Sequence, residues 1–249
     1  MTTAKRAALV TGGASGIGRS ICLRLARDGV AVAVLDLNHP DAEATAAAIA
    51  AAGGQAMAVD ADVADATAVR AAVDRVHTGL GPVHVMVNVA GIGAFVPLLD
   101  MTDAEWNRMI AVHLTGTFNC TRAVLPDMLA AGWGRIVNTA SVAGLNGGGP
   151  GLSHYAAAKG GIIAFSKALA HELGPSGITV NCIAPGLVDT PLIRSSLVTA
   201  ELRARAVEGA PVRRIGTPDD IAAACAFLVS DESSFCTGQV ISPNGGRYM

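Results

Sequence analysis

Charged and aromatic side chains are scarce in this sequence of 249 residues, where they make up 15% and 4% of the chain. The 18 Lys and Arg residues nearly balance the 20 Asp and Glu residues, so the net charge is −2, and the basic residues form no stripe. A protein that binds nucleic acid or an anionic membrane surface needs such a stripe. We therefore expect a small-molecule partner, and neither nucleic acid nor membrane.

Long hydrophobic runs and paired cysteines are also missing. The four apolar residues from Ala7 to Val10 are too few for a signal-peptide core, and no apolar run reaches the roughly 20 residues that a membrane span needs. The cysteines lie far apart, without the spacing of metal ligands or of a disulfide framework, which is typical of reduced, packed thiols. These absences predict a soluble, cytoplasmic protein without a metal site. The five cysteines are Cys22, Cys120, Cys182, Cys225 and Cys236.

Apolar residues are plentiful, at 51%, in short runs that alternate with amphipathic, alanine-rich stretches. The runs lack polar alternation, as strands covered on both faces require. The pattern predicts an α/β, doubly wound parallel sheet of seven strands with helices on both faces, in one domain over residues 1–249. Residues 185–211 interrupt this rhythm, and we expect them to form a mobile helical lid over the substrate. The predicted strands are Ala7–Thr11, Ala31–Asp36, Gln55–Asp60, Val83–Val89, Gly134–Thr139, Gly177–Ile183 and Gln239–Ser242, and the predicted helices are Ile17–Arg27, Asp41–Ala52, Ala66–Thr78, Asp103–Leu129, Tyr155–Leu173 and Pro218–Leu228.

A glycine-rich turn joins the first predicted strand to the first predicted helix, and it reads Thr-Gly-Gly-Ala-Ser-Gly-Ile-Gly from Thr11 to Gly18. Glycines there let the backbone approach a pyrophosphate, to which the helix N-terminus presents its N–H groups. Asp36 closes the second strand, where a carboxylate binds ribose hydroxyls and repels a 2′-phosphate, so the expected cofactor is NAD. The alternatives are a bare glycine turn and an ordinary strand-end aspartate.

Tyr155 and Lys159 stand four residues apart at the head of a predicted helix, so their side chains project from one face. An ammonium near a phenol stabilises the phenolate and lowers the pKa of the tyrosine, which makes the pair a candidate acid/base. The alternative is a half-buried core tyrosine beside a solvated lysine.

Together these motifs resemble the short-chain dehydrogenase/reductase family in its single-domain form, over essentially the whole chain. The resemblance implies that Ser141 and Tyr155 bind the substrate oxygen, with Tyr155 as the acid/base. It also implies that Lys159 holds the nicotinamide ribose and lowers the pKa of Tyr155. A hydride then moves between the substrate carbon and the nicotinamide.

The resemblance also implies a set of cofactor-binding residues. Asp62 and Val63 match a pair that contacts adenine, and Asn88 to Gly91 matches a motif in which a second asparagine is usual where this chain has Val89. NADP-dependent members carry a positive charge at Ser15 or Leu37, and this chain has none there, although Arg19 is nearby. For Pro185, Gly186, Val188 and Thr190, the alternative is a Pro-Gly turn before a helix N-cap, which needs no ligand. The implied residues are Gly12, Ser15, Gly16, Ile17, Gly18, Asp36, Asp62, Val63, Asn88, Ala90, Gly91, Tyr155, Lys159, Pro185, Gly186, Val188 and Thr190.

One position departs from the family pattern. His113 stands where the family has a fourth catalytic residue, an asparagine whose main-chain carbonyl holds a relay water to the lysine. Because any residue has that carbonyl, we expect activity to be retained, with His113 keeping the backbone role and joining the proton relay through its imidazole. The alternative is a packed histidine.

The run from Asn146 to Gly151 and the neighbouring His154 are expected to shape a roomy substrate mouth, although a plain surface loop is the alternative. Phe95, Leu192 and Ile193 are candidates for its apolar walls.

The sequence therefore predicts an NAD-dependent oxidoreductase for a secondary alcohol or ketone. The alternatives are a 3-oxoacyl-thioester reductase of acyl carrier protein or CoA, against whose expected NADPH use Asp36 argues, and a nucleotide-binding protein without catalysis. The resemblance implies a homotetramer in which the predicted helices 103–129 and 155–173 and the segment Gln239 to Met249 pack between subunits.

Overall fold

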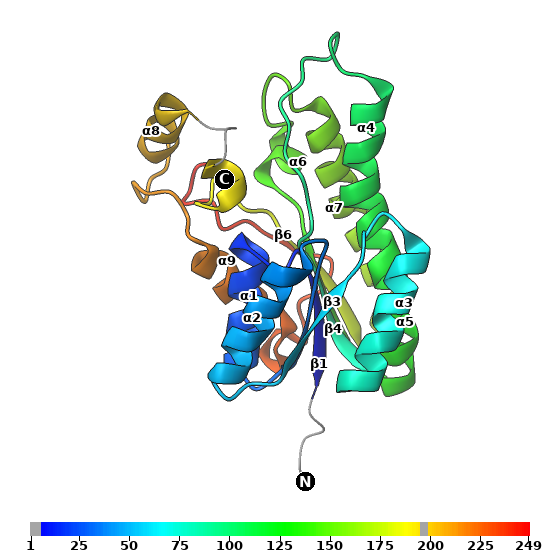
Figure 1. The fold of residues 1–249 in the computed structure, drawn as a ribbon. Coiled ribbons are helices and arrows are strands. Elements are labelled where there is room, and N and C mark those ends of the chain that lie inside the picture. Colours follow the sequence, from blue (N-terminus) through cyan, green and yellow to red (C-terminus); the bar gives the residue numbers. More distant parts are fainter. Residues whose placement is uncertain (1–5, 195–198) are drawn as a thin grey trace.

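A computed structural model describes residues 6–194 and 199–249 of the chain. Its centre is a sheet of seven parallel strands in the order β3-β2-β1-β4-β5-β6-β7 (Figure 1), which confirms the predicted fold class. The strands are β1 (Ala7–Thr11), β2 (Ala31–Asp36), β3 (Ala56–Asp60), β4 (Val83–Asn88), β5 (Gly134–Thr139), β6 (Ile178–Ile183) and β7 (Val240–Ile241).

Helices cover both faces of the sheet, with α1, α2 and α9 on one side and α3, α5 and α7 on the other (Figure 1). Successive residues of each strand pack against opposite layers, as in β1, where Val10 joins the first layer and Leu9 the second. This double burial explains why the strands are apolar without alternation. The helices are α1 (Gly16–Arg27), α2 (His39–Ala51), α3 (Ala66–Leu80), α4 (Asp103–Ile110), α5 (Gly116–Ala131), α6 (Val142–Asn146), α7 (Ser153–Leu173), α8 (Ala200–Glu208) and α9 (Pro218–Val229).

The expected single helix over Asp103–Leu129 is wrong in its middle. A π-helical turn, Ala111–Thr115, separates α4 from α5, and His113 lies at its centre. The N–H of Gly116 bonds to the carbonyl of Ala111 there, one residue farther back than in an α-helix. This wide turn is a local change of hydrogen bonding that apolar periodicity does not reveal.

The strand order reverses between β1 and β4, which lie side by side although β2 and β3 come between them in the sequence. In such sheets the loops after the two central strands diverge and leave a crevice at their carboxyl ends. The loops after β1 and β4 therefore frame the candidate site.

The expected lid over residues 185–211 contains α8, but residues 195–198 of it lie outside the described part of the chain, and its mobility stays a prediction. Within residues 6–194 and 199–249, no helix is long and apolar enough to cross a bilayer.

Candidate active site

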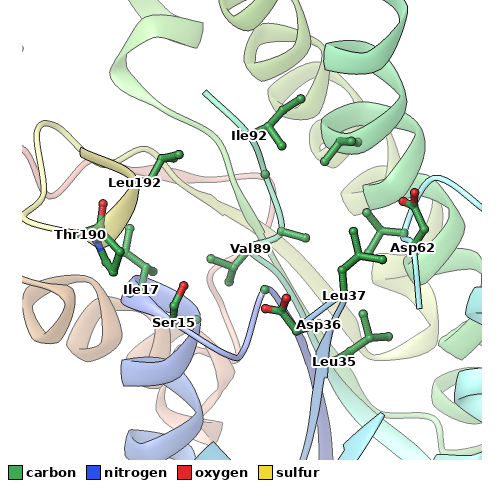
Figure 2. Close-up of a pocket in the computed structure, with 18 of the residues that line it drawn as sticks. Ser15, Ile17, Leu35, Asp36, Leu37, Asp62, Val89, Ile92, Thr190 and Leu192 are labelled. Atoms are coloured by element: carbon green, nitrogen blue, oxygen red, sulfur yellow. The ribbon is translucent and has the colours of Figure 1, made fainter. Parts of the chain in front are cut away.

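The glycine turn forms a tight cradle at the N-terminus of α1. Gly12 has a φ of +67°, which favours glycine, and a Cβ on Gly18 would collide with the carbonyl oxygen of Gly12. The turn and the start of α1 line a cavity of about 290 Å³. Figure 2 shows Ser15 and Ile17 at this cavity, with Thr190 above them. The backbone of the turn thus packs closely against itself on one side and faces the cavity on the other.

Asp36 lines the same cavity from the end of β2 (Figure 2). Its carboxylate accepts hydrogen bonds from the backbone N–H groups of Ala14 at 3.1 Å and of Asn38 at 3.0 Å. The carboxylate is therefore fixed between the glycine turn and the β2–α2 connection. A charged group on a substrate or cofactor at this end of the cavity would meet a negative charge.

Arg108 is a cavity residue that the sequence did not reveal. It reaches the cavity from α4 and forms an ion pair of 3.2 Å with Asp62. Arg19, by contrast, is exposed and is not among the described residues that line the cavity. Arg108 is the one cation among those lining residues, and Asp62 already balances its charge. Arg108 reaches the cavity because the fold places α4 beside it, and no local sequence motif indicates this.

The loop after β4 forms the opposite wall. The hydroxyl of Thr11 accepts hydrogen bonds from the N–H groups of Val89 at 3.0 Å and Ala90 at 3.1 Å, so the backbone contacts survive the loss of the usual asparagine. Val89 instead lines the cavity with its side chain. Asn88 lies beneath, where its amide donates to Asn138 and Thr121 at 2.8 and 3.1 Å in the central sheet.

The segment after β6 contributes unevenly. Thr190 lines the cofactor cavity against Gly16, whereas the side chain of Val188 is buried in the core. Gly186 lines a second cavity instead. Of the other predicted cofactor residues, Asp62, Val63, Ala90 and Gly91 line the first cavity, whereas Asn88 and Pro185 line neither cavity.

These features fit a nicotinamide dinucleotide. The cradle admits no Cβ at Gly18, presents the start of α1 to a phosphate, and has a fixed carboxylate at the position of a ribose. Asp62, the second acid of this cavity, is paired with Arg108, so Asp36 is the acid left to meet a ribose.

Ser141 and Tyr155 line the second cavity, of about 600 Å³, together. Ser141 is the N-cap of α6, where its hydroxyl accepts a hydrogen bond of 3.1 Å from the N–H of Ala143. Tyr155 projects from the first turns of α7 and lines the same cavity. Two hydroxyl groups thus lie in the wall of one cavity.

Lys159 is buried behind Tyr155, with its Nζ 5.7 Å from the centre of the phenol ring and 2.6 Å from the carbonyl oxygen of Thr139. Burial lowers the pKa of Lys159 to about 7. Burial also raises the pKa of Tyr155, and the hydroxyl of Ser141 opposes this only in part. The expected lowering of the Tyr155 pKa therefore does not occur with these residues alone, because desolvation disfavours both charged forms.

His113 is buried at the centre of the π-helical turn. Its Nε2 lies 2.8 Å from the carbonyl oxygen of Ile92 and 3.1 Å from the N–H of the same residue. Burial, and then the charge of Lys159, lower the pKa of His113 to about 3. Its carbonyl oxygen accepts a hydrogen bond of 2.7 Å from the hydroxyl of Thr117. A neutral imidazole that holds the Ile92 backbone favours the packed alternative over the proton relay.

Most of the predicted substrate side lines the second cavity, including Phe95, Leu192, Ile193 and residues 148–150. His154 does not, since it is fully buried. Its position directly before Tyr155 on α7 turns it into the helix packing and away from the cavity. The C-terminal residues Arg247 and Tyr248 line the cavity instead.

Known proteins resemble this chain over almost its whole length. A family model described as enoyl-(acyl carrier protein) reductase matches residues 12–247. The short-chain reductase protein NovJ of Streptomyces niveus is 44% identical over 96% of this chain and 93% of its own. An acetoacetyl-CoA reductase of Cupriavidus necator is 41% identical over 98% of this chain and 99% of its own.

A 3-oxoacyl-[acyl-carrier-protein] reductase of Staphylococcus epidermidis is also 41% identical, over 98% of this chain and 99% of its own. The chain therefore belongs to the short-chain dehydrogenase/reductase family and is an oxidoreductase that acts on CH–OH or keto groups.

Proposed function

We propose that the chain uses NAD(H) to interconvert a secondary alcohol and a ketone, with Tyr155 as the acid/base. The observation that carries this proposal is the adjacency of the two cavities, because Ile92 and Leu192 line both. A substrate oxygen beside Ser141 and Tyr155 thus lies next to the cofactor cavity. When bound, the nicotinamide supplies the hydride acceptor or donor.

The chain's own residues handle the proton. Burial keeps Tyr155 in its phenol form, which is the form that donates a proton to a ketone oxygen. The Ser141 hydroxyl, which lines the same cavity as Tyr155, orients that same oxygen. Lys159 lies behind the ring and holds the end of β5 through the Thr139 carbonyl. Gly12, Ser15 to Gly18, and Thr190 are proposed to hold the cofactor.

The proposed preference for NAD over NADP rests on charge. Asp36 is fixed at one end of the cavity, and the cation Arg108 is already paired with Asp62. A 2′-phosphate next to Asp36 would therefore meet repulsion without an available counter-charge among the described lining residues.

We also propose a homotetramer in the cytoplasm. Phe118 on α5 packs against Phe165 on α7 with ring centres 6.3 Å apart, yet Phe118 remains 40% exposed. Leu129 on α5 is exposed as well, and exposed apolar side chains along one long helix are candidates for burial against a second copy. Light scattering of the purified protein measures its mass, and a monomer would contradict this part of the proposal.

A 3-oxoacyl-thioester reductase is the second candidate, favoured by the two relatives named for 3-oxoacyl and acetoacetyl thioesters. The cavity of about 600 Å³ has room for more than a small ketone. Under this alternative the same residues would reduce a thioester-linked ketone.

One assay tests these candidates. In the reductive direction, oxidation of NADH or NADPH is measured with a panel of ketones and with acetoacetyl-CoA. In the oxidative direction, reduction of NAD is measured with secondary alcohols. We expect turnover with NADH and a fall of about 10²–10⁴-fold in kcat for Tyr155→Phe. Calorimetric binding of NAD to the variant controls for folding. Tight NAD binding without any turnover would instead support a nucleotide-binding protein that lacks catalysis.

A further inference from the structure

The second cavity is lined mostly by apolar residues and glycines and has one charged residue in its wall. Ile92, Phe95, Leu152 and Leu187 are among its walls, and Ser141 and Tyr155 supply the hydroxyl groups. Arg247 is the only charged residue among the described residues that line it. A ligand that fills the cavity therefore meets an apolar surface with a single cation.

The C-terminal turn is built to hold Arg247 at this place. The amide of Asn244 donates to the carbonyl of Tyr248 and to the hydroxyl of Ser242, both at 2.8 Å. The N–H of Arg247 in turn donates to the carbonyl of Asn244 at 3.3 Å. Ser242 is itself bonded to the carbonyl of Ala184 at 2.8 Å, beyond β6. The turn is thus closed on itself and tied to the central sheet.

Asn244 is also a departure from the family, in which aspartate is common at this position. An ionised carboxylate only accepts hydrogen bonds, so it cannot donate to the Tyr248 carbonyl. The asparagine therefore adds two hydrogen bonds that an aspartate could not donate to the turn that carries Arg247 and Tyr248.

Arg247, like Arg205 and Arg213, has no carboxylate partner in the described part of the chain, but of these three arginines it alone lines the second cavity. Arg194 and Arg203 both pair with Asp189, at 2.8 and 3.0 Å, and Arg214 pairs with Asp220. No ion pair joins Arg247 to any residue in the described part of the chain. The side chain of Arg247 is exposed at the rim of the second cavity, and it also lines a neighbouring pocket that contains Asp220, whose carboxylate is already paired with Arg214. Such a guanidinium is suited to an anion on the ligand, which it binds through paired N–H donors.

We propose that Arg247 binds an anionic group on the substrate, so that the substrate class is a ketone or secondary alcohol with an apolar body and an anionic end. This inference rests on the proposed function, because it assumes that the reacting oxygen lies at Ser141 and Tyr155. The anion is either a carboxylate of an oxo acid or a phosphate of a CoA-type thioester. Both present oxygen acceptors to the same guanidinium.

Matched substrates test the proposal. The first arm compares 3-oxobutanoate, 4-oxopentanoate and 5-oxohexanoate with their methyl esters. The second compares acetoacetyl-CoA with the acetoacetyl thioester of N-acetylcysteamine, which has no phosphate. The measurement in each arm is the ratio of kcat/KM for the anionic substrate to that for its neutral partner, in native protein and in Arg247→Gln.

We expect Arg247→Gln to lower that ratio about tenfold in the arm that contains the true anion, because the charge-assisted hydrogen bonds are lost at a partly solvated site. Arg247→Lys should restore part of it. Arg205→Gln is the matched control, since Arg205 is an exposed arginine of α8 that lines neither cavity. An unchanged ratio in both arms for Arg247→Gln, or an equal fall for Arg205→Gln, would overturn the proposal.

A binding measurement separates this proposal from the proposed function. The rise in melting temperature caused by each oxo acid and by acetoacetyl-CoA in the presence of NAD is recorded for native protein and Arg247→Gln. Loss of this stabilisation in Arg247→Gln supports the anion site even if no ketone is turned over, a result that would contradict the proposed function alone. Equal stabilisation of both proteins would count against the anion site.

Discussion

The imidazole of His113 packs edge-on against the phenol of Tyr155, with ring centres 5.4 Å apart and planes at 89°. The same imidazole holds the backbone of Ile92, which lines both cavities. His113 therefore joins three parts of the site, namely the π-helical turn, the loop after β4 and the ring of the proposed acid/base. It does so as a neutral ring, because its pKa is lowered to about 3.

Replacing His113 by asparagine tests whether the imidazole carries a proton. We expect the pH dependence of kcat for His113→Asn to match that of the native protein between pH 6 and 9, since a group with a pKa of about 3 does not titrate there. A loss of kcat that is uniform over this range reports only positioning of Tyr155. A shift of the rising or falling part of the pH profile in His113→Asn, relative to the native protein, would support the proton-relay hypothesis instead.

Gly91 faces the imidazole so closely that a Cβ at this position would collide with Cε1 of His113. We expect Gly91→Ala to lower the free energy of unfolding by about 1–3 kcal/mol, the usual cost of overpacking. Denaturant unfolding measures it, with Gly174→Ala as the control because nothing lies near that glycine. The cost should shrink in a His113→Ala background, and additive effects of the two changes would contradict the proposed contact.

Acid stability follows from the same buried imidazole. The pKa of His113 is about 3 in the folded chain against an ordinary value of 6.5, so the unfolded chain binds the extra proton between these values. Stability is therefore complete above pH 6.5 and falls as the pH drops toward 3, by about 2 kcal/mol between pH 7 and pH 5. His113→Asn should flatten this slope in urea unfolding. The exposed His171→Asn serves as the control, and equal slopes in all three proteins would contradict the assignment.

Asp36 should set the choice of cofactor. We expect Asp36→Ser to raise the ratio of kcat/KM for NADPH to that for NADH by about tenfold to a hundredfold, because the charge that faces a 2′-phosphate is removed. Asp60 ends the neighbouring strand and pairs with Arg75, but it does not line the cofactor cavity. Asp60→Ser is thus the matched control, and an equal change in both variants would show a general charge effect.

Local patterns in the sequence determined the sheet and the place of its motifs. The strands β1, β2 and β5 have the predicted bounds, because a strand buried on both faces must be apolar at every position. The glycine turn and Asp36 follow from the same reasoning, since a strand end in a parallel sheet faces the ligand crevice. Ser141 and Tyr155 were predicted as partners from the family likeness, and the fold brings them to one cavity.

Only the tertiary structure decided the charges and the neighbours of the site. The protonation of His113, Lys159 and Tyr155 depends on how far each group is buried away from water. The spacing of residues in the sequence does not predict that burial. Arg108 and Arg247 reach the two cavities from α4 and from the C-terminal turn, far along the chain from the motifs they join. The sequence thus determined where the chemistry lies, and packing across long separations decided its electrostatics.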